Sequence, residues 1–233
     1  MSPSPRAKPR GNGLCSSDLA LIPTTNHRLS TAPLVPRTFY LRDPREVARD
    51  VLGKLLVRRE GKSQLAGRIV EVEAYLRTDD PVAHSAAGRT ARNEVLFGPP
   101  GHAYVYFIYG VHYCLNVSCM PEGDAGCVLI RALEPIGGTE QMARNRKLKL
   151  SAHPTQRELR LLTSGPGRLA QALAITRSRD NDKDVTVRKS DLQILDDNYH
   201  SGRIATSKRI GITKAAEAHL RFAIPDNPFV SRR

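Results

Sequence analysis

The 233-residue sequence contains no tryptophan, only four cysteines and no long apolar segment. Its cysteines form no C-x-x-C pair and have no histidine at zinc-site spacing, so we expect reduced thiols, no disulfide and no metal. No segment approaches the roughly 18 consecutive apolar residues of a membrane-spanning helix. The N-terminus lacks the apolar core of a signal peptide. We therefore expect a protein of the cytoplasm, associated with the nucleoid, or of the nucleus, and not a secreted or membrane protein.

Acidic residues are scarce relative to basic ones, with 36 Lys and Arg against 23 Asp and Glu and a net charge of +13. This excess favours a polyanionic partner, and nucleic acid is a better candidate than a membrane because no basic amphipathic helix stands out. Residues 1–36 hold six of the sixteen prolines and four cations against a single acid. We expect a disordered basic tail over 1–36 and one folded domain over 37–233.

Strand-like and helix-like segments occur in separate groups along the chain. A capped helix is expected at 43–53, followed by two strands, LLVRR and QLAGRIVEVEAYL, that flank a turn at 60–62. A second hairpin is expected around residue 110, then the apolar strand CVLIRAL, and then helices near 139–147, 155–162 and 167–174. This grouping predicts an α+β fold: a single domain with a curved antiparallel β-sheet, flanking helices and a protruding β-hairpin.

Four of the seven tyrosines lie within ten residues, from Tyr104 to Tyr113. Strands favour tyrosine, and core filling explains Tyr104 and Tyr113 adequately. Tyr109 fits that explanation badly, because Gly110 allows a sharp turn and places Tyr109 at the tip of the predicted hairpin. An aromatic tip on a basic body suggests a protein that contacts bases as well as phosphates.

Charged residues interrupt two of the apolar strands. Glu73 lies in IVEVEAY, on the same strand face as Glu71, and Arg131 lies in CVLIRAL. Taken alone, Glu73 is best explained as an edge-strand acid that faces water, whereas a buried Glu with a buried Arg forms either a structural ion pair or a device that positions water. His84 follows the loop that leaves the Glu73 strand, so the two side chains can share a cleft, although a lone histidine is more often a surface residue.

Six motifs, in this order and at this spacing, resemble the alkyladenine (3-methyladenine) DNA glycosylases. They are VEVEAY, AHSAAGRTARN, AYVYFIYGVHYCLNVS, GCVLIRALEP, SGPGRLAQAL and RIGIT. The resemblance implies a monofunctional glycosylase that flips alkylated or deaminated purines out of double-stranded DNA and hydrolyses the N-glycosidic bond with an activated water, without a metal or cofactor. It implies the first step of base excision repair, and we expect a monomer.

The resemblance also implies residue roles. Glu73 matches the general base that activates the water. Arg131 matches the arginine that helps to hold this water and the carboxylate. Tyr109 matches the residue that fills the gap left by the extruded nucleotide. The positions that match the purine pocket are Tyr75, His84, Tyr106 and Asn116, the last of which excludes the exocyclic amine of guanine. The positions that match phosphate contacts are Arg89, Thr90 and Arg92.

Three other classes of protein remain as alternatives. A non-catalytic nucleic-acid binding protein would use the tyrosines as a stacking platform, and Glu73 would be dispensable. A zinc deaminase also flips bases, but its H-x-E and P-C-x-x-C patterns are absent from the sequence. A glycosylase with lyase activity would use a lysine amine as its nucleophile, and borohydride would trap its Schiff base.

Overall fold

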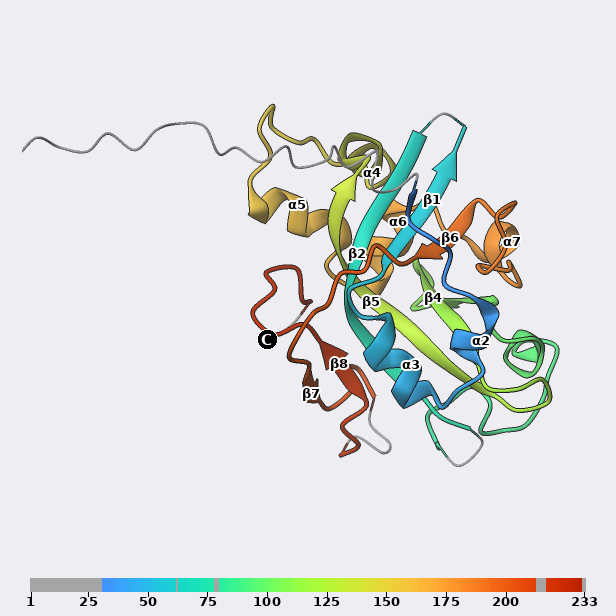
Figure 1. Cartoon of the computed structure of the whole chain (residues 1–233). Coiled ribbons are helices and arrows are strands. Elements are labelled where there is room, and N and C mark those ends of the chain that lie inside the picture. The colour runs from blue at the N-terminus through green and yellow to red at the C-terminus, as the bar shows by residue number, and fades with distance from the viewer. Residues whose placement is uncertain (1–30, 62, 78–79, 213–216, 232–233) are drawn as a thin grey trace, which may run out of the picture.

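The structure is a computed structural model that describes residues 31–61, 63–77, 80–212 and 217–231. Its centre is a curved antiparallel sheet with the strand order β3-β4-β5-β2-β1-β6, to which β8 and then β7 are added beside β2 (Figure 1). The strands are β1 Leu55–Glu60, β2 Ser63–Tyr75, β3 Ala103–Ile108, β4 His112–Cys119, β5 Gly126–Gly137, β6 Leu192–Leu195, β7 Ala205–Ser207 and β8 Arg221–Ala223. The predicted α+β class and curved antiparallel sheet are confirmed.

The central strand β2 is buried from Leu65 to Ala74. One of its edges pairs first with β1 and then with β8, while the other edge pairs with β5. The pairing with β5 shifts register near Gly67 and again around Glu71. Such bulges bend a strand and increase its twist, which suits the curvature of this sheet and redirects nearby side chains.

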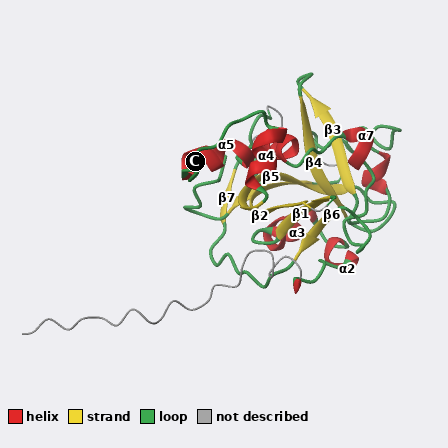
Figure 2. Ribbon diagram, turned by 90° about the horizontal axis from the view of Figure 1, so that it is seen from above, coloured by secondary structure: helices red, strands yellow, loops and turns green. Residues whose placement is uncertain are grey.

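The helices cover both faces of the sheet. They are α2 Arg37–Tyr40, α3 Pro44–Val51, the 3-10 helix η1 Glu94–Phe97, α4 Thr139–Asn145, α5 Gln156–Thr163, α6 Pro166–Ala172 and α7 Arg177–Asp180. Figure 2 shows α4 and α5 on one side of the sheet and α2 and α3 on the other. The α3 helix begins as predicted, because the Asp43 carboxylate accepts a hydrogen bond from the Arg45 N–H. Gly53 follows it with a φ of 86°.

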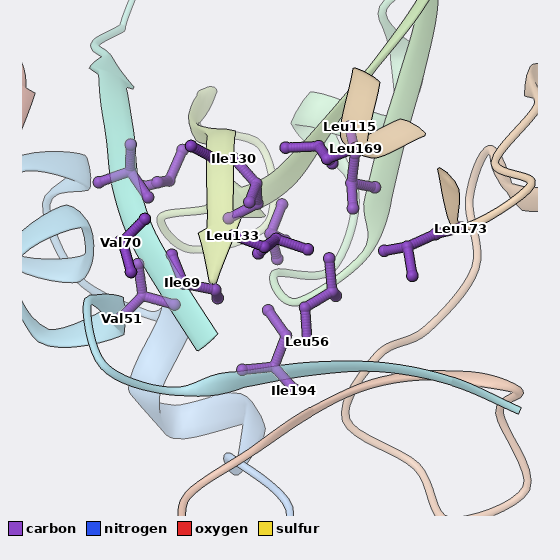
Figure 3. Close-up of a cluster of buried hydrophobic side chains, with 14 of the residues drawn as sticks. Val51, Leu56, Ile69, Val70, Leu115, Ile130, Leu133, Leu169, Leu173 and Ile194 are labelled. Atoms are coloured by element: carbon purple, nitrogen blue, oxygen red, sulfur yellow. The ribbon is translucent and has the colours of Figure 1, made fainter. Parts of the chain in front are cut away.

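The hydrophobic core lies between the sheet and these helices (Figure 3). Val51 of α3, Val70 of β2 and Ile130 of β5 are at most 2% exposed. Leu169 of α6 and Leu115 of β4 are fully buried at the other side of the cluster. The α6 helix contacts both β4 and β5, so the core connects the body of the domain to the strand that returns from the hairpin.

The predicted second hairpin is confirmed and projects from the body of the domain (Figure 2). Tyr109 and Gly110 occupy its tip with φ values of 50° and 67°, and the Val111 N–H donates to the Ile108 carbonyl. Two consecutive residues with positive φ give the tight turn whose twist matches antiparallel strands. The Tyr109 side chain is therefore presented outward and is 81% exposed.

Packing of the chain begins before Arg37. Val35 is buried, and its N–H donates to the Ile194 carbonyl of β6. Residues 1–30 of the predicted tail, together with Cys15, lie outside the described residues. Within the described residues, Cys114, Cys119 and Cys127 are free and buried. No helix in this part of the chain is long and apolar enough to cross a membrane.

Candidate active site

A cavity of about 380 Å³ opens at the base of the β3–β4 hairpin. This volume lies within the roughly 300–1,000 Å³ of small-molecule sites. Among the residues of its wall are Tyr75, His84, Tyr104, Tyr106, Asn116 and Arg131. The end of β2, the loop after it, the hairpin and β5 thus bring five of the predicted site residues to one place.

Glu73 lies directly behind the wall of this cavity and is fully buried. Its Oε1 accepts from the Ile210 N–H at 2.8 Å and forms an ion pair with Arg131 Nη1 at 3.1 Å. Its Oε2 accepts from the Tyr75 hydroxyl at 3.0 Å. All three partners line the cavity. The interpretation of Glu73 as an edge acid that faces water is wrong, because β5 and β8 cover both edges of β2 here.

The arrangement leaves the Glu73 carboxylate able to accept one more hydrogen bond. A carboxylate offers about four acceptor positions, two on each oxygen. Within the described part of the chain, two donors approach Oε1 and one approaches Oε2. The free position belongs to Oε2, the oxygen held by Tyr75. A water bound there would be next to the aromatic cavity and oriented by a fixed base.

Arg131 is buried and contacts two carboxylates at once, through Nε to Glu71 at 3.0 Å and through Nη1 to Glu73 at 3.1 Å. Burial lowers the pKa of Arg131, but the charges of Glu73 and Glu71 outweigh burial and raise this pKa above its ordinary value. The guanidinium is therefore a permanent positive charge beside the carboxylates.

Three rings form a continuous aromatic wall. The His84 and Tyr106 ring centroids are 4.4 Å apart at an interplanar angle of 68°, and those of Tyr104 and Tyr106 are 5.6 Å apart. A hydrogen bond of 2.8 Å joins His84 Nδ1 to the Tyr104 hydroxyl. Partial burial, with a contribution from the charge of Arg92, lowers the pKa of His84, so its ring is neutral at pH 7. Burial raises the pKa of Tyr106, which keeps the phenol protonated.

A buried ion pair that the sequence analysis missed supports Tyr75 from behind. Arg209 donates to both oxygens of Asp80, at 2.6 and 2.9 Å, and to the Ala74 carbonyl at 3.1 Å. Its guanidinium carbon lies 4.7 Å from the Tyr75 ring centroid. Arg209 also precedes Ile210, whose N–H holds Glu73. The two partners are 129 positions apart, and no spacing in the sequence pairs them.

Asn116 is buried on β4, and its amide is held on both sides. Its Nδ2 donates to the Tyr104 carbonyl at 3.1 Å, and the Cys127 thiol donates to its Oδ1 at 3.7 Å. Burial raises the pKa of Cys127 to about 12, so this sulfur remains a thiol donor. The orientation of the Asn116 amide in the cavity wall is thus fixed by the protein.

The remaining predicted residues lie at the rim or outside the cavity. Tyr109 lines the cavity, and Gly211, which also lines it, lies near the Tyr109 hydroxyl. Arg89 is exposed and forms an ion pair with Glu94 at 2.8 Å. The exposed Thr90 donates from its N–H and its hydroxyl to Asn93. Arg89, Thr90 and Arg92 are exposed and do not line the cavity, but Arg92 is close enough for its charge to act on His84 and Tyr104 in the cavity wall.

In the part of the chain that the structure describes, no three His, Cys, Asp or Glu side chains gather in a way that would hold a metal ion. The described site is built from a buried carboxylate, two arginines, aromatic rings and the Ile210 N–H. Such a set can bind a flat aromatic ligand, stabilise charge and accept a proton.

Comparison with known proteins agrees with this geometry. Residues 38–228 match the family model of methylpurine-DNA glycosylases. The "Putative 3-methyladenine DNA glycosylase" of Koribacter versatilis is 62% identical over 200 residues, which cover 86% of this chain and 93% of the relative. Relatives with the same name from Alkaliphilus oremlandii and Methanoculleus marisnigri are 45% and 47% identical, covering 84% and 85% of this chain and 98% and 99% of their own. The chain therefore belongs to the methylpurine-DNA glycosylase family and is a DNA glycosylase, a hydrolase of DNA repair.

Proposed function

We propose that this glycosylase flips alkylated or deaminated purines out of double-stranded DNA and hydrolyses their N-glycosidic bond with an activated water. The observation that carries the proposal is the buried Glu73 carboxylate, fixed by Arg131 and the Ile210 N–H behind an aromatic cavity. A buried carboxylate must be paired and hydrogen-bonded, and the partners of Glu73 all line a ligand-sized cavity, which favours a catalytic role over a purely structural one.

We assign the flipping of the damaged nucleotide to the tip of the β3–β4 hairpin. Tyr109 is 81% exposed, lines the cavity and stands on a two-residue turn. Extrusion of a nucleotide costs a few kcal/mol of stacking and pairing, and least for a damaged or mispaired base. A phenol inserted into the vacated position restores part of the lost stacking. The tip and the cavity are therefore parts of one recognition step.

The cavity walls suit a purine. Alkylated purines carry a delocalised positive charge, and an electron-rich aromatic face attracts such a charge by roughly 0.5–2 kcal/mol per contact. Tyr75 and Tyr106 supply such faces, while Asn116 restricts the space for an exocyclic amine. His84 touches Tyr106 edge-on. A base can therefore stack between the His84 and Tyr106 rings only if the His84 ring moves.

In the proposed reaction, Glu73 takes a proton from the water as the water oxygen bonds to the sugar C1′. The C1′–N bond breaks at the same centre, and the leaving purine keeps the bonding electron pair. Positive charge develops on the sugar ring, and the nearby carboxylate stabilises it. Arg131 keeps the carboxylate in place throughout. We propose that the protein does this as a monomer on cytoplasmic, nucleoid-associated DNA.

A panel of duplex oligonucleotides, each with one lesion, tests the proposal. The panel contains 7-methylguanine, hypoxanthine and ethenoadenine, with undamaged duplex as the control. We expect release of free purine base that increases with time, an intact abasic strand and no adduct after borohydride treatment. Absence of free base from every lesion would contradict the proposal, and a trapped adduct would instead indicate a lysine nucleophile.

A further inference from the structure

A second carboxylate is buried two residues before Glu73, and the proposed hydrolysis does not use it. Glu71 is fully buried, and its Oε1 accepts from Arg131 Nε at 3.0 Å and from Arg221 Nε at 2.7 Å. The C-terminal Ser231 donates to it twice, from its hydroxyl to Oε1 at 2.9 Å and from its N–H to Oε2 at 2.6 Å. Four donors from three separate segments thus meet at one carboxylate.

One guanidinium connects the two carboxylates. Arg131 stands on β5 opposite the bulged part of β2, where the register shifts on either side of Glu71. The bulge places Glu71 and Glu73 so that Nε of Arg131 reaches the first and Nη1 reaches the second. A guanidinium is planar and rigid, so fixing Nε also fixes the direction of Nη1. The contact with Glu71 therefore determines where Arg131 presents its charge to Glu73.

The charges of this cluster balance, since Glu71 and Glu73 oppose Arg131 and Arg221. All four residues are at most 9% exposed, so water screens their interactions little. Burial raises the pKa of Glu71, but Arg131, the Ser231 N–H and Arg221 outweigh burial and lower it below its ordinary value. Glu71 is thus ionised whenever the enzyme is folded at neutral pH.

Other polar groups face the same cluster. They are the Tyr75 hydroxyl and the Ile210 N–H at Glu73, the Cys114 thiol near Glu73 and Arg131, and the Ser207 hydroxyl at Arg221. Burial raises the pKa of Cys114 to about 11 and also raises the pKa of Tyr75, so neither adds charge at neutral pH.

We propose that Glu71 is a positioning residue of the glycosylase, which together with Arg221 and Ser231 fixes Arg131 and sets the charge around Glu73. The inference rests on the proposed role of Glu73 as general base and adds the C-terminal segment to the support of the active site. Displacement of Ser231 would leave a buried carboxylate with two lost donors, so the segment that carries Ser231 supports the active site.

The proposal predicts opposite effects for two neutral substitutions. Glu71→Gln removes one negative charge from the cluster around the active site, so the acid limb of the pH–rate profile moves to lower pH. Arg221→Gln removes one positive charge, so the limb moves up. A charge close to a titrating group shifts the pKa of that group by roughly one unit or more. Each acid limb should therefore move by about one pH unit. A general loss of structure would lower the rate of both variants without moving the limbs apart.

The measurement is single-turnover release of hypoxanthine from a duplex oligonucleotide as a function of pH, with release in enzyme-free samples subtracted. Circular dichroism defines the pH range in which each variant is folded. Glu140→Gln is the matched control, because it removes the same charge from a side chain on α4 that is 88% exposed. Its profile is expected to coincide with that of the unaltered protein. NMR titration of His84 in each variant shows whether the ionisation of His84 accounts for a movement of the limb.

Limbs displaced in opposite directions by Glu71→Gln and Arg221→Gln support the proposal. Limbs that stay in place, or that move in the same direction, overturn it. If Glu71→Gln does not fold, the Arg221→Gln limb decides alone, with movement to higher pH as the supporting result. Failure of the unaltered protein to release any base contradicts the proposed function itself, whereas normal release with unmoved limbs contradicts only the role of Glu71.

Discussion

At the scale of single residues, the proposed function depends on side chains whose surroundings differ sharply. Glu73 is fully buried, whereas Tyr109 is 81% exposed. Because Glu73 is buried, its hydrogen-bond donors determine the orientation of the carboxylate oxygens that accept the proton. Because Tyr109 is exposed, the two-residue turn that carries it determines where its ring is presented.

Tyr109→Ala is predicted to weaken flipping without unfolding the protein. Gly110 has open space around its Cα, and the Tyr109 ring is mostly exposed, so its loss leaves no cavity in the core. The fluorescence change of an ethenoadenine duplex on binding is expected to shrink, while the circular dichroism spectrum stays the same. A full fluorescence change in the variant would contradict the wedge assignment.

His84 is predicted to titrate below its ordinary value of about 6.5. Partial burial, and then the charge of Arg92, lowers the pKa of the folded state. The unfolded chain binds a proton more readily, so the contribution of neutral His84 to stability is complete above the unfolded pKa and is lost as the pH falls from there through the lower folded pKa. NMR titration of the ring measures the midpoint, and a value at or above the ordinary one would contradict the description of its environment.

At the scale of elements, buried ion pairs join segments that no backbone pairing connects. Arg209 and Asp80 link the segment that follows β7 to the loop that carries His84, and they brace Tyr75 on the cavity wall. The aromatic wall is therefore held by loops rather than by the sheet alone.

Asp80→Ala is predicted to destabilise the protein by about 3–5 kcal/mol, because it leaves Arg209 buried without its partner. Asp50→Ala is the matched control, since it breaks the exposed pair with Arg42 and is expected to cost about 0–1 kcal/mol. Denaturant unfolding at neutral pH measures both. Equal midpoints for the two variants would show that the buried pair does not support the loop.

Acid should remove the contribution of Asp80. Burial raises its pKa, but the hydrogen bonds and charge of Arg209 and the N–H groups of Leu76 and Val82 outweigh burial and lower it. The stabilisation is thus present above the ordinary aspartate value of about 4 and is lost as the pH falls below it. The difference in stability between the unaltered protein and Asp80→Ala should shrink accordingly.

At the scale of the whole molecule, the net charge of +13 predicts salt-dependent DNA binding. Release of counterions from roughly four to six phosphates gives a slope near −4 to −5 in a plot of log affinity against log salt. Fluorescence anisotropy of a labelled duplex at several salt concentrations measures this slope. A slope close to zero would contradict a backbone-based mode of binding.

The sequence predicted the elements better than the contacts between them. The alternation of side chains and the glycine at 110 were sufficient to predict the hairpin, because both signals are local in the sequence. The burial of Glu73 was missed, because it depends on β8, which lies about 150 positions further along the chain. The four-donor arrangement at Glu71 was missed for the same reason, since its partners come from β5, β8 and the C-terminal segment.

The central claim is that the buried Glu73 carboxylate activates the water, and single-turnover release of hypoxanthine by Glu73→Gln tests it most directly. The amide keeps the size of the side chain but cannot take the proton. With Glu140→Gln as the control that should retain the full rate, we predict that Glu73→Gln still binds the lesion duplex but releases base more slowly by roughly a hundredfold or more. An unchanged rate of base release would contradict the account.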